Sequence, residues 1–177
     1  MMKTTWRTST LTALAALALT ATTVSAQYST PLDSDGPDEA AALLRDAREA
    51  LNGEADWGRA SVLLRRAADL RSDVPEAADH YRRAGIFAFY AGREGRAVDH
   101  LTRAAETALA WGDVAAAAQS YLDAAWVSHQ AGEGARTLEL VERAERLANS
   151  PLLPRGDRAR LMSRITEEPQ PIDFPGA

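Results

Sequence analysis

The sequence predicts an all-α protein, an α-solenoid of about three antiparallel helical hairpins followed by one further, capping helix. Apolar residues recur every three or four positions between residues 38 and 165, which is the spacing of one face of an α-helix. Glycines interrupt these stripes where helices are expected to end, and one short pattern returns about every 40 positions. No apolar–polar alternation of strand length occurs, so a β-sheet is not expected.

Six apolar stripes and one shorter segment predict the helices in order. The stripes cover residues 43–51, 60–70, 81–91, 97–108, 114–125 and 138–147, and the shorter segment covers 155–165. Glycine is favoured directly after a helix, which predicts helix ends at Gly53, Gly92, Gly112 and Gly132. Aspartate oxygens cap first turns, which predicts helix starts at Asp56, Asp73 and Asp113. Pro75 fits the first turn of a helix.

The pattern Leu/Val-x-Arg-Ala recurs in three of these predicted helices. It stands at residues 64–67, 101–104 and 141–144. Tyr81 and Tyr121 precede the second and third copies and lie 40 residues apart. Two-helix units at such a period indicate hairpins stacked on one another, because one hairpin cannot bury its apolar face alone.

The middle unit resembles a tetratricopeptide repeat. The resemblance rests on a large aromatic residue, a small close-packing pair, a glycine turn and small residues in the second helix, which are Tyr81, Ala84, Gly85, Gly92, Ala97, Leu101 and Ala104. The other units depart from the family pattern at Arg48, in place of a glycine, and at Thr137, in place of an alanine. The longer period predicts helices about one turn longer than usual, or different loops. A generic α-solenoid and a plain helical bundle are the alternatives.

The N-terminus has the features of a secretory signal peptide. Lys3 and Arg7 supply a positive start, residues 11–21 are mostly apolar, and small residues at 24–26 predict cleavage after Ala26. The apolar run is short for a ~30 Å hydrocarbon core, so retention as an anchor is the weaker alternative. We therefore expect export to the periplasm or cell envelope of a bacterium, or secretion. The predicted organisation is a signal peptide (1–26), a flexible leader (27–37), a TPR-like helical-repeat domain (38–166) and a Pro-rich flexible tail (167–177).

Composition excludes several classes of function. The chain has no cysteine, which excludes disulfides, thiolate-bound metals and a cysteine nucleophile. The formal net charge is −5, and removal of the signal peptide takes away Lys3 and Arg7 but no acid. An acidic protein has no electrostatic attraction to nucleic acid, so no such partner is expected. No segment after the signal peptide is long and apolar enough to predict an integral membrane span.

No motif predicts a metal, a cofactor or catalysis. His80, His100 and His129 have no second histidine three or four positions away, so no pair of ligands shares a helical face. Residues 33–38 resemble part of a calcium loop, but Leu44 stands where the closing glutamate is required. The chain is therefore expected not to be an enzyme. The weaker alternative is a catalytic site that uses His129 with a nearby carboxylate, such as Glu49 or Asp79.

The resemblance also implies where a partner would bind. In tetratricopeptide repeats the first helix of each hairpin lines a concave groove, and the matching positions here are Arg45, Glu49, Asp79, Arg82, Ile86, Phe89, Leu122, Trp126 and His129. Arginines beside aromatic and aliphatic anchors are typical of a peptide-binding groove. The alternative is that Phe89 and Trp126 pack against each other and against the last helix. Trp57 and Trp111 flank turns, where a large ring is expected to seal a junction between hairpins.

The function predicted from these observations is that of an exported protein-interaction scaffold or adaptor, which binds a protein or peptide partner in the periplasm or cell envelope. The alternative is a structural accessory subunit of a larger envelope complex. Such a subunit would be held by its outer helical faces or by the tail at 167–177.

Overall fold

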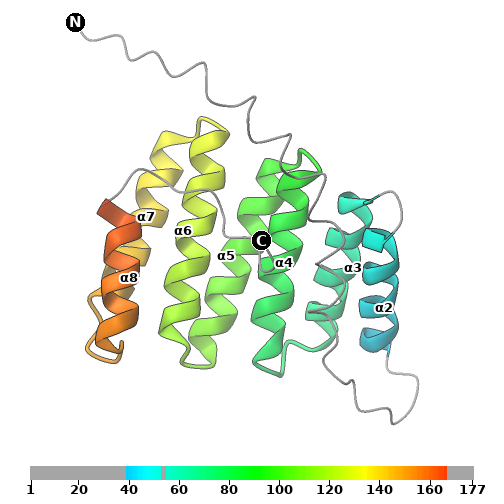
Figure 1. Ribbon diagram of the computed structural model, residues 1–177, viewed down its shortest axis with the longest axis horizontal. Helices are drawn as coiled ribbons and strands as arrows, with labels where there is room; N and C mark the ends of the chain where they lie inside the picture. Colours follow the sequence, from blue (N-terminus) through cyan, green and yellow to red (C-terminus); the bar gives the residue numbers. More distant parts are fainter. Residues whose placement is uncertain (1–38, 53–54, 167–177) are drawn as a thin grey trace, which may run out of the picture. The chain divides into compact units, whose positions relative to one another are not determined.

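The computed structural model describes residues 39–52 and 55–166 (Figure 1). Within these residues it contains seven α-helices and no strand, which confirms the predicted all-α class. The helices are α2 (Glu39–Asn52), α3 (Trp57–Leu70), α4 (Glu76–Tyr90), α5 (Glu94–Ala110), α6 (Val114–Gln130), α7 (Gly134–Ala148) and α8 (Arg155–Thr166). The predicted signal peptide, leader, calcium-loop fragment and tail, and the helix end predicted at Gly53, lie outside the described residues.

Consecutive helices pack against each other along the described chain, and α8 lies against both α6 and α7 (Figure 1). Much of the interior is alanine, and five alanines with 0% exposure lie in four consecutive helices: Ala84, Ala88, Ala104, Ala124 and Ala144. Helices α4 and α5 approach closely at Gly85, because a methyl group at its Cβ position would lie 2.6 Å from Leu101 Cγ. The small pair expected from the sequence, Ala84 and Gly85, is therefore confirmed as a close-packing pair.

Three of the predicted glycines end their helices in the same way. Gly92, Gly112 and Gly132 have φ angles of 68°, 78° and 77°, in the left-handed region that glycine adopts at low cost. In each turn the glycine N–H donates to the carbonyl three residues earlier, and the next N–H donates to the carbonyl five residues before it. This is the Schellman arrangement, which satisfies carbonyls that the helix itself leaves unpaired. The predicted helix ends at these positions are confirmed.

Two of the three predicted helix starts are confirmed. The Oδ1 atoms of Asp56 and Asp113 each accept a hydrogen bond of 2.9 Å from the backbone N–H three residues later. The predicted start at Asp73 is wrong, because a turn closed by Val74 N–H carries the chain beyond Asp73 before α4 begins. Pro75, expected in the first turn, occupies the cap position of α4 and makes no side-chain cap bond.

The two tryptophans expected to seal hairpin junctions behave differently. The ring of Trp57, at the start of α3, packs against Phe87 and Tyr90 of α4, with centroids 5.4 and 5.6 Å apart. It therefore covers the α3–α4 junction as predicted. Trp111, at the end of α5, is 49% exposed, so the prediction that it seals a junction is wrong. Trp111 instead lines a cavity together with residues of α4 and α6.

Candidate functional site

Side chains of α4 and α6 meet at two points. Near the middle of the helices Arg82 Nε donates to Asp123 Oδ2 at 2.8 Å. Towards their C-terminal ends the rings of Phe89 and Trp126 meet with centroids 4.9 Å apart. Both helices also pack against α5, which supports them from one side. We call the line of contact marked by these two pairs the α4–α6 seam.

Asp123 is the most deeply buried charged residue of this seam. Its side chain is 0% exposed, and it accepts hydrogen bonds from Arg82 of α4 and, at 3.0 Å, from Arg164 Nη2 of α8. A carboxylate is strongly destabilising in the interior unless it is paired, and this one is paired twice. Arg82, Asp123 and Arg164, which we call the buried charge cluster, thereby join α4, α6 and α8.

The buried charge cluster has two cations for one anion. Arg82 Nη2 is buried and has no hydrogen-bond partner. A buried donor without an acceptor costs about 1–3 kcal/mol. The cluster is therefore short of one hydrogen-bond acceptor on the Arg82 side.

The Phe89–Trp126 pair is both packed and partly accessible. The ring planes are inclined by 68°, the edge-to-face arrangement that the charge distribution of aromatic rings favours. Both side chains are half-buried. The contact between the two rings, one part of the packing alternative, is thus confirmed, and both residues remain partly exposed.

A cavity of about 250 Å³ lies beside the buried charge cluster. Its walls come from the first halves of α4 and α6 and from the end of α5, and they are Pro75, Ala78, Asp79, Arg82, Ala108, Trp111, Asp113, Ala116, Gln119 and Ser120. The hollow exists because small residues such as Ala78, Ala116 and Ser120 occupy the facing helices. Asp79 and Asp113 are exposed whereas Arg82 is mostly buried, so the carboxylates lie nearer to solvent than the guanidinium.

The structure separates the predicted groove residues into exposed and buried ones. Four are exposed, namely Arg45, Glu49, Asp79 and His129. Ile86 is 1% exposed and Leu122 is 7% exposed, so the expectation that they face a groove is corrected. Both are interior residues because α4 and α6 are covered on more than one side by their neighbours. The side chain of Arg82 is 15% exposed, and its Nε is paired with Asp123.

No hydrogen bond or ion pair of the described residues joins His129 to Glu49 or Asp79, the carboxylates considered for a catalytic site. Asp79 pairs instead with Arg83, one turn further along α4, at 2.8 Å. A general base needs a group that orients it and a group that exchanges its proton, both within hydrogen-bond reach. This combination therefore has no geometric support.

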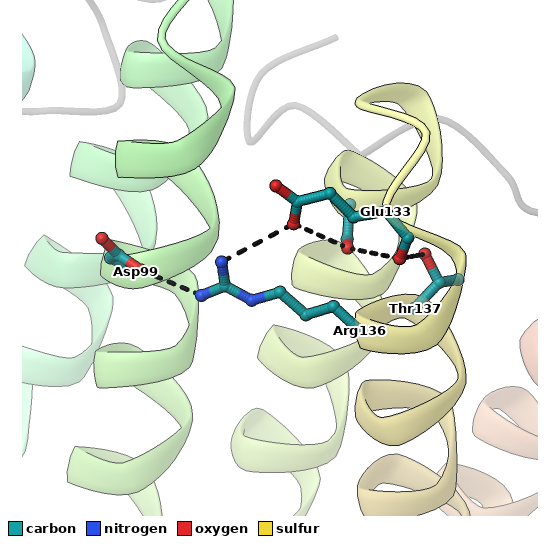
Figure 2. A network of polar contacts seen from close by, with 5 residues as sticks. Asp99, Glu133, Arg136 and Thr137 are labelled. Atoms are coloured by element: carbon teal, nitrogen blue, oxygen red, sulfur yellow. Dashed lines mark hydrogen bonds and ion pairs between the residues drawn. The ribbon is translucent and has the colours of Figure 1, made fainter.

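A second polar network links α5 and α7 (Figure 2). Arg136 of α7 donates from Nη2 to Asp99 of α5 at 2.9 Å, and its Nη1 lies 3.6 Å from Glu133 Oε2. Thr137 Oγ1 donates to the Glu133 carbonyl at 3.1 Å. All of these side chains are partly or largely exposed, so the network contributes less to stability than the buried charge cluster.

Burial lowers the pKa of two histidines. For His80 desolvation is the main cause, and Asp79 opposes it by favouring the charged ring. For His100 desolvation is again the main cause, reinforced by the nearby charge of Arg65. Both rings are half-buried. A neutral imidazole is therefore favoured at each position in the folded protein.

The sequence predictions missed two of the three residues of the buried charge cluster, Asp123 and Arg164. A signal for Asp123 is present, because it is the only Asp, Glu, Arg or Lys of α6. A single charge within an otherwise uncharged helix is expected to be buried and paired. Arg164 has no such signal, because α8 contains several arginines and only the fold shows which one reaches Asp123.

Among residues 39–52 and 55–166, no three His, Asp or Glu side chains are grouped closely enough to hold a metal ion. None of the described helices combines the length and the apolar character needed to cross a membrane. Comparison of the chain with family models, curated proteins and solved structures found no match.

Proposed function

We propose that this chain is an exported, tetratricopeptide-like α-solenoid that works as a protein-interaction scaffold or adaptor in the periplasm or cell envelope, or after secretion. The single observation that supports the interaction role most directly is the Phe89–Trp126 pair. These two partly accessible rings are fixed against each other across two helices. Aromatic anchors on a rigid frame lose little conformational entropy on binding, and they are enriched among residues that dominate interface energetics.

Contacts between helices two apart in the chain support a solenoid of stacked hairpins. Arg82–Asp123 and Phe89–Trp126 join α4 to α6, and Arg164–Asp123 joins α6 to α8. Arg136–Asp99 joins α5 to α7. Such a double set of contacts is expected if α4, α6 and α8 form one layer and α5 and α7 form the other.

α8 is proposed as the capping helix of this stack. Its buried residue Leu161 packs inward, and Arg158 Nη2 donates to the Ser150 carbonyl at 2.7 Å. A terminal helix with one apolar position turned inward and several arginines elsewhere covers the end of a repeat array and keeps it soluble.

Partner capture with a matched pair of tryptophan variants tests the interaction role. The mature form should be used to capture partners from envelope extracts of its source, and a recurrent protein should then be purified and titrated directly. Trp126→Ala is expected to weaken its binding at least tenfold, as for a central aromatic anchor. Trp111→Ala removes an exposed tryptophan away from the Phe89–Trp126 pair and is the control. Equal binding by both variants would contradict the proposal that the partner binds at the Phe89–Trp126 pair.

The alternative of a structural accessory subunit is favoured by one specific observation. Leu138 of α7 is 67% exposed and Leu152, in the α7–α8 turn, is 79% exposed. Exposed leucines on an outer surface suit burial in an assembly. This function would be favoured if the assembly were lost in the Leu138→Ser and Leu152→Ser variants, or on deletion of 167–177. The assembly should then be retained in Trp126→Ala.

Export can be tested separately. Cell fractionation and N-terminal sequencing of the isolated protein are expected to give an envelope or secreted form that begins at Gln27, after cleavage behind Ala26. A cytoplasmic protein that retains Met1 would contradict the proposed location.

A further inference from the structure

We propose that the cavity beside Arg82 binds a small zwitterion, a molecule that carries a carboxylate and an ammonium group a few bonds apart, as a free amino acid does. The cavity measures about 250 Å³, below the roughly 300–1,000 Å³ of pockets for drug-sized ligands. It is large enough for an amino acid and too small for a folded segment of a partner. This site is distinct from the Phe89–Trp126 pair proposed to bind a protein.

The buried end of the cavity is suited to a carboxylate. Arg82 lines it, and the buried charge cluster to which Arg82 belongs has two guanidinium groups for one carboxylate. Arg82 uses Nε to hold Asp123, whereas its Nη2 has no acceptor. Because Nη2 is buried, the guanidinium must turn towards the cavity for Nη2 to donate to a ligand carboxylate while Nε keeps Asp123. Such a charge-assisted hydrogen bond is stronger than one between neutral groups.

The exposed end of the cavity is suited to an ammonium group. The exposed residues Asp79 and Asp113 line it, together with Trp111, which is 49% exposed. Asp79 pairs with Arg83 and Asp113 caps α6, yet each carboxylate has further lone pairs available. An ammonium also gains from lying over an indole face.

The opposite signs at the two ends select a zwitterion over either ion alone. A plain carboxylate would meet Arg82 but would be repelled by Asp79 and Asp113. A plain amine would meet the carboxylates and leave Arg82 Nη2 without an acceptor. The apolar wall formed by Ala78, Ala108 and Ala116 receives the aliphatic part of the ligand.

Titration of the purified full chain tests this proposal. The probes are L-alanine, L-leucine and L-glutamate, with propionate as the carboxylate alone and propylamine as the ammonium alone. Calorimetry or NMR is expected to show binding of at least one amino acid, about tenfold or more tighter than either single-charge probe. The absence of binding by all three amino acids at about 10 mM would overturn the proposal.

Variants in the cavity wall locate the site. Ala116→Leu fills the cavity and is expected to weaken amino-acid binding about tenfold or more, whereas Ala115→Leu, on the neighbouring position of α6, is expected to leave it within about twofold. Asp113→Ser keeps a capping oxygen but removes a carboxylate, so the preference for an amino acid over propionate should fall. Unchanged affinity in Ala116→Leu, or an unchanged preference in Asp113→Ser, would contradict the site. Partner capture is read out separately, so failure here would leave the proposed protein interaction intact.

Discussion

Asp123 shows how one side chain can join three helices. It lies on α6 with no exposed surface, and arginines from α4 and α8 supply both of its ion pairs. Because the carboxylate is buried, loss of either arginine is expected to cost more stability than loss of one partner in an exposed ion pair. The pair formed by Arg136 and Asp99 offers a natural comparison, since its distance is similar but both side chains are substantially exposed.

Replacement of Asp123 is therefore expected to be strongly destabilising. Asp123→Asn should lower the free energy of unfolding by about 3–5 kcal/mol, because it leaves two arginines largely buried without their counter-ion. The matched control Asp99→Asn should cost at most about 1 kcal/mol, as for exposed ion pairs. Urea denaturation of both variants measures the difference. Similar losses in the two would show that burial does not set the value of these pairs.

Gly85 and Gly95 form a second contrast between residues. A methyl group at Gly85 would collide with Leu101, so Gly85→Ala should lower the free energy of unfolding by about 1–3 kcal/mol. At Gly95, also within a helix, a methyl group meets no atom within 4 Å, so Gly95→Ala should raise it by up to about 1 kcal/mol through better helix propensity. Thermal or urea unfolding decides the sign of each effect. Stabilisation by Gly85→Ala would contradict the close approach of α4 and α5.

The sequence predicts the close packing at Gly85 better than it predicts the ion pairs of Asp123. Gly85 is predictable because Ala84 and Gly85 form a pair of small residues at a repeated position, and such a pair can be recognised from neighbouring residues alone. The pairing of Asp123 depends on residues 41 positions away on either side, Arg82 and Arg164, and no local pattern specifies such partners. Likewise, periodicity placed Ile86 and Leu122 on helices correctly but did not show that neighbouring helices cover them.

At the scale of elements, four consecutive helices with their turns follow a spacing of 20 residues, which is half the period of the proposed hairpins. α3, α4, α5 and α6 end at Leu70, Tyr90, Ala110 and Gln130, which are 20 residues apart. Buried small or apolar residues follow the same spacing at Leu64, Ala84, Ala104, Ala124 and Ala144. The sequence predicted a two-helix period because aromatic residues such as Tyr81 and Tyr121 occur in alternate helices. The shorter period depends on alanines, which are too common in this chain to be noticed as a pattern.

The glycine turns that close these units are expected to be intolerant of side chains. Gly112 has a φ of 78°, and forcing alanine into a left-handed conformation costs about 1–2 kcal/mol. Gly112→Ala should lower the free energy of unfolding by that amount. Gly134→Ala is the control, because Gly134 does not have a positive φ and a methyl group there meets nothing. Equal unfolding transitions for the two variants would argue against the left-handed turn.

α8 is expected to be the least protected of the helices compared here. Only Leu161 is buried in α8, whereas α5 buries six residues along its length. Regions with few buried apolar contacts open at lower free energy, so amides of α8 should exchange with deuterium about tenfold or more faster than those of α5. Hydrogen exchange with mass spectrometry measures this. Equal protection of α8 and α5 would show that the Arg164–Asp123 pair anchors α8 as firmly as a packed core does.

For the whole molecule, the all-α class followed from apolar periodicity and glycine positions because these are properties of each helix alone. The α4–α6 seam and the cavity could not be predicted in this way. They depend on which faces of α4 and α6 meet, and a rotation of α6 by one position would replace Ala116 and Ser120 in the cavity wall with other residues. The aspartate rule also failed at one position, Asp73, where a turn separates the aspartate from the start of α4.

Part of the dependence of global stability on pH is expected to come from His80 and His100. Burial lowers the pKa of both below the ordinary value of 6.5 in the folded state. Between 6.5 and the lowered values the unfolded chain binds more protons than the folded one, so stability falls as the pH falls. The loss begins as the pH passes through about 6.5 and is complete only below the folded pKa values.

Replacement of these histidines should remove part of that dependence. His80→Gln and His100→Gln are expected to flatten the decline of the unfolding free energy between about pH 7 and pH 5, because neither glutamine gains a proton on unfolding. His129→Gln, at an exposed position of α6, is the matched control and should retain the decline. Urea denaturation at several pH values measures all three variants. If His80→Gln and His100→Gln together decline as steeply as the original chain, then carboxylates rather than the half-buried imidazoles control the acid response.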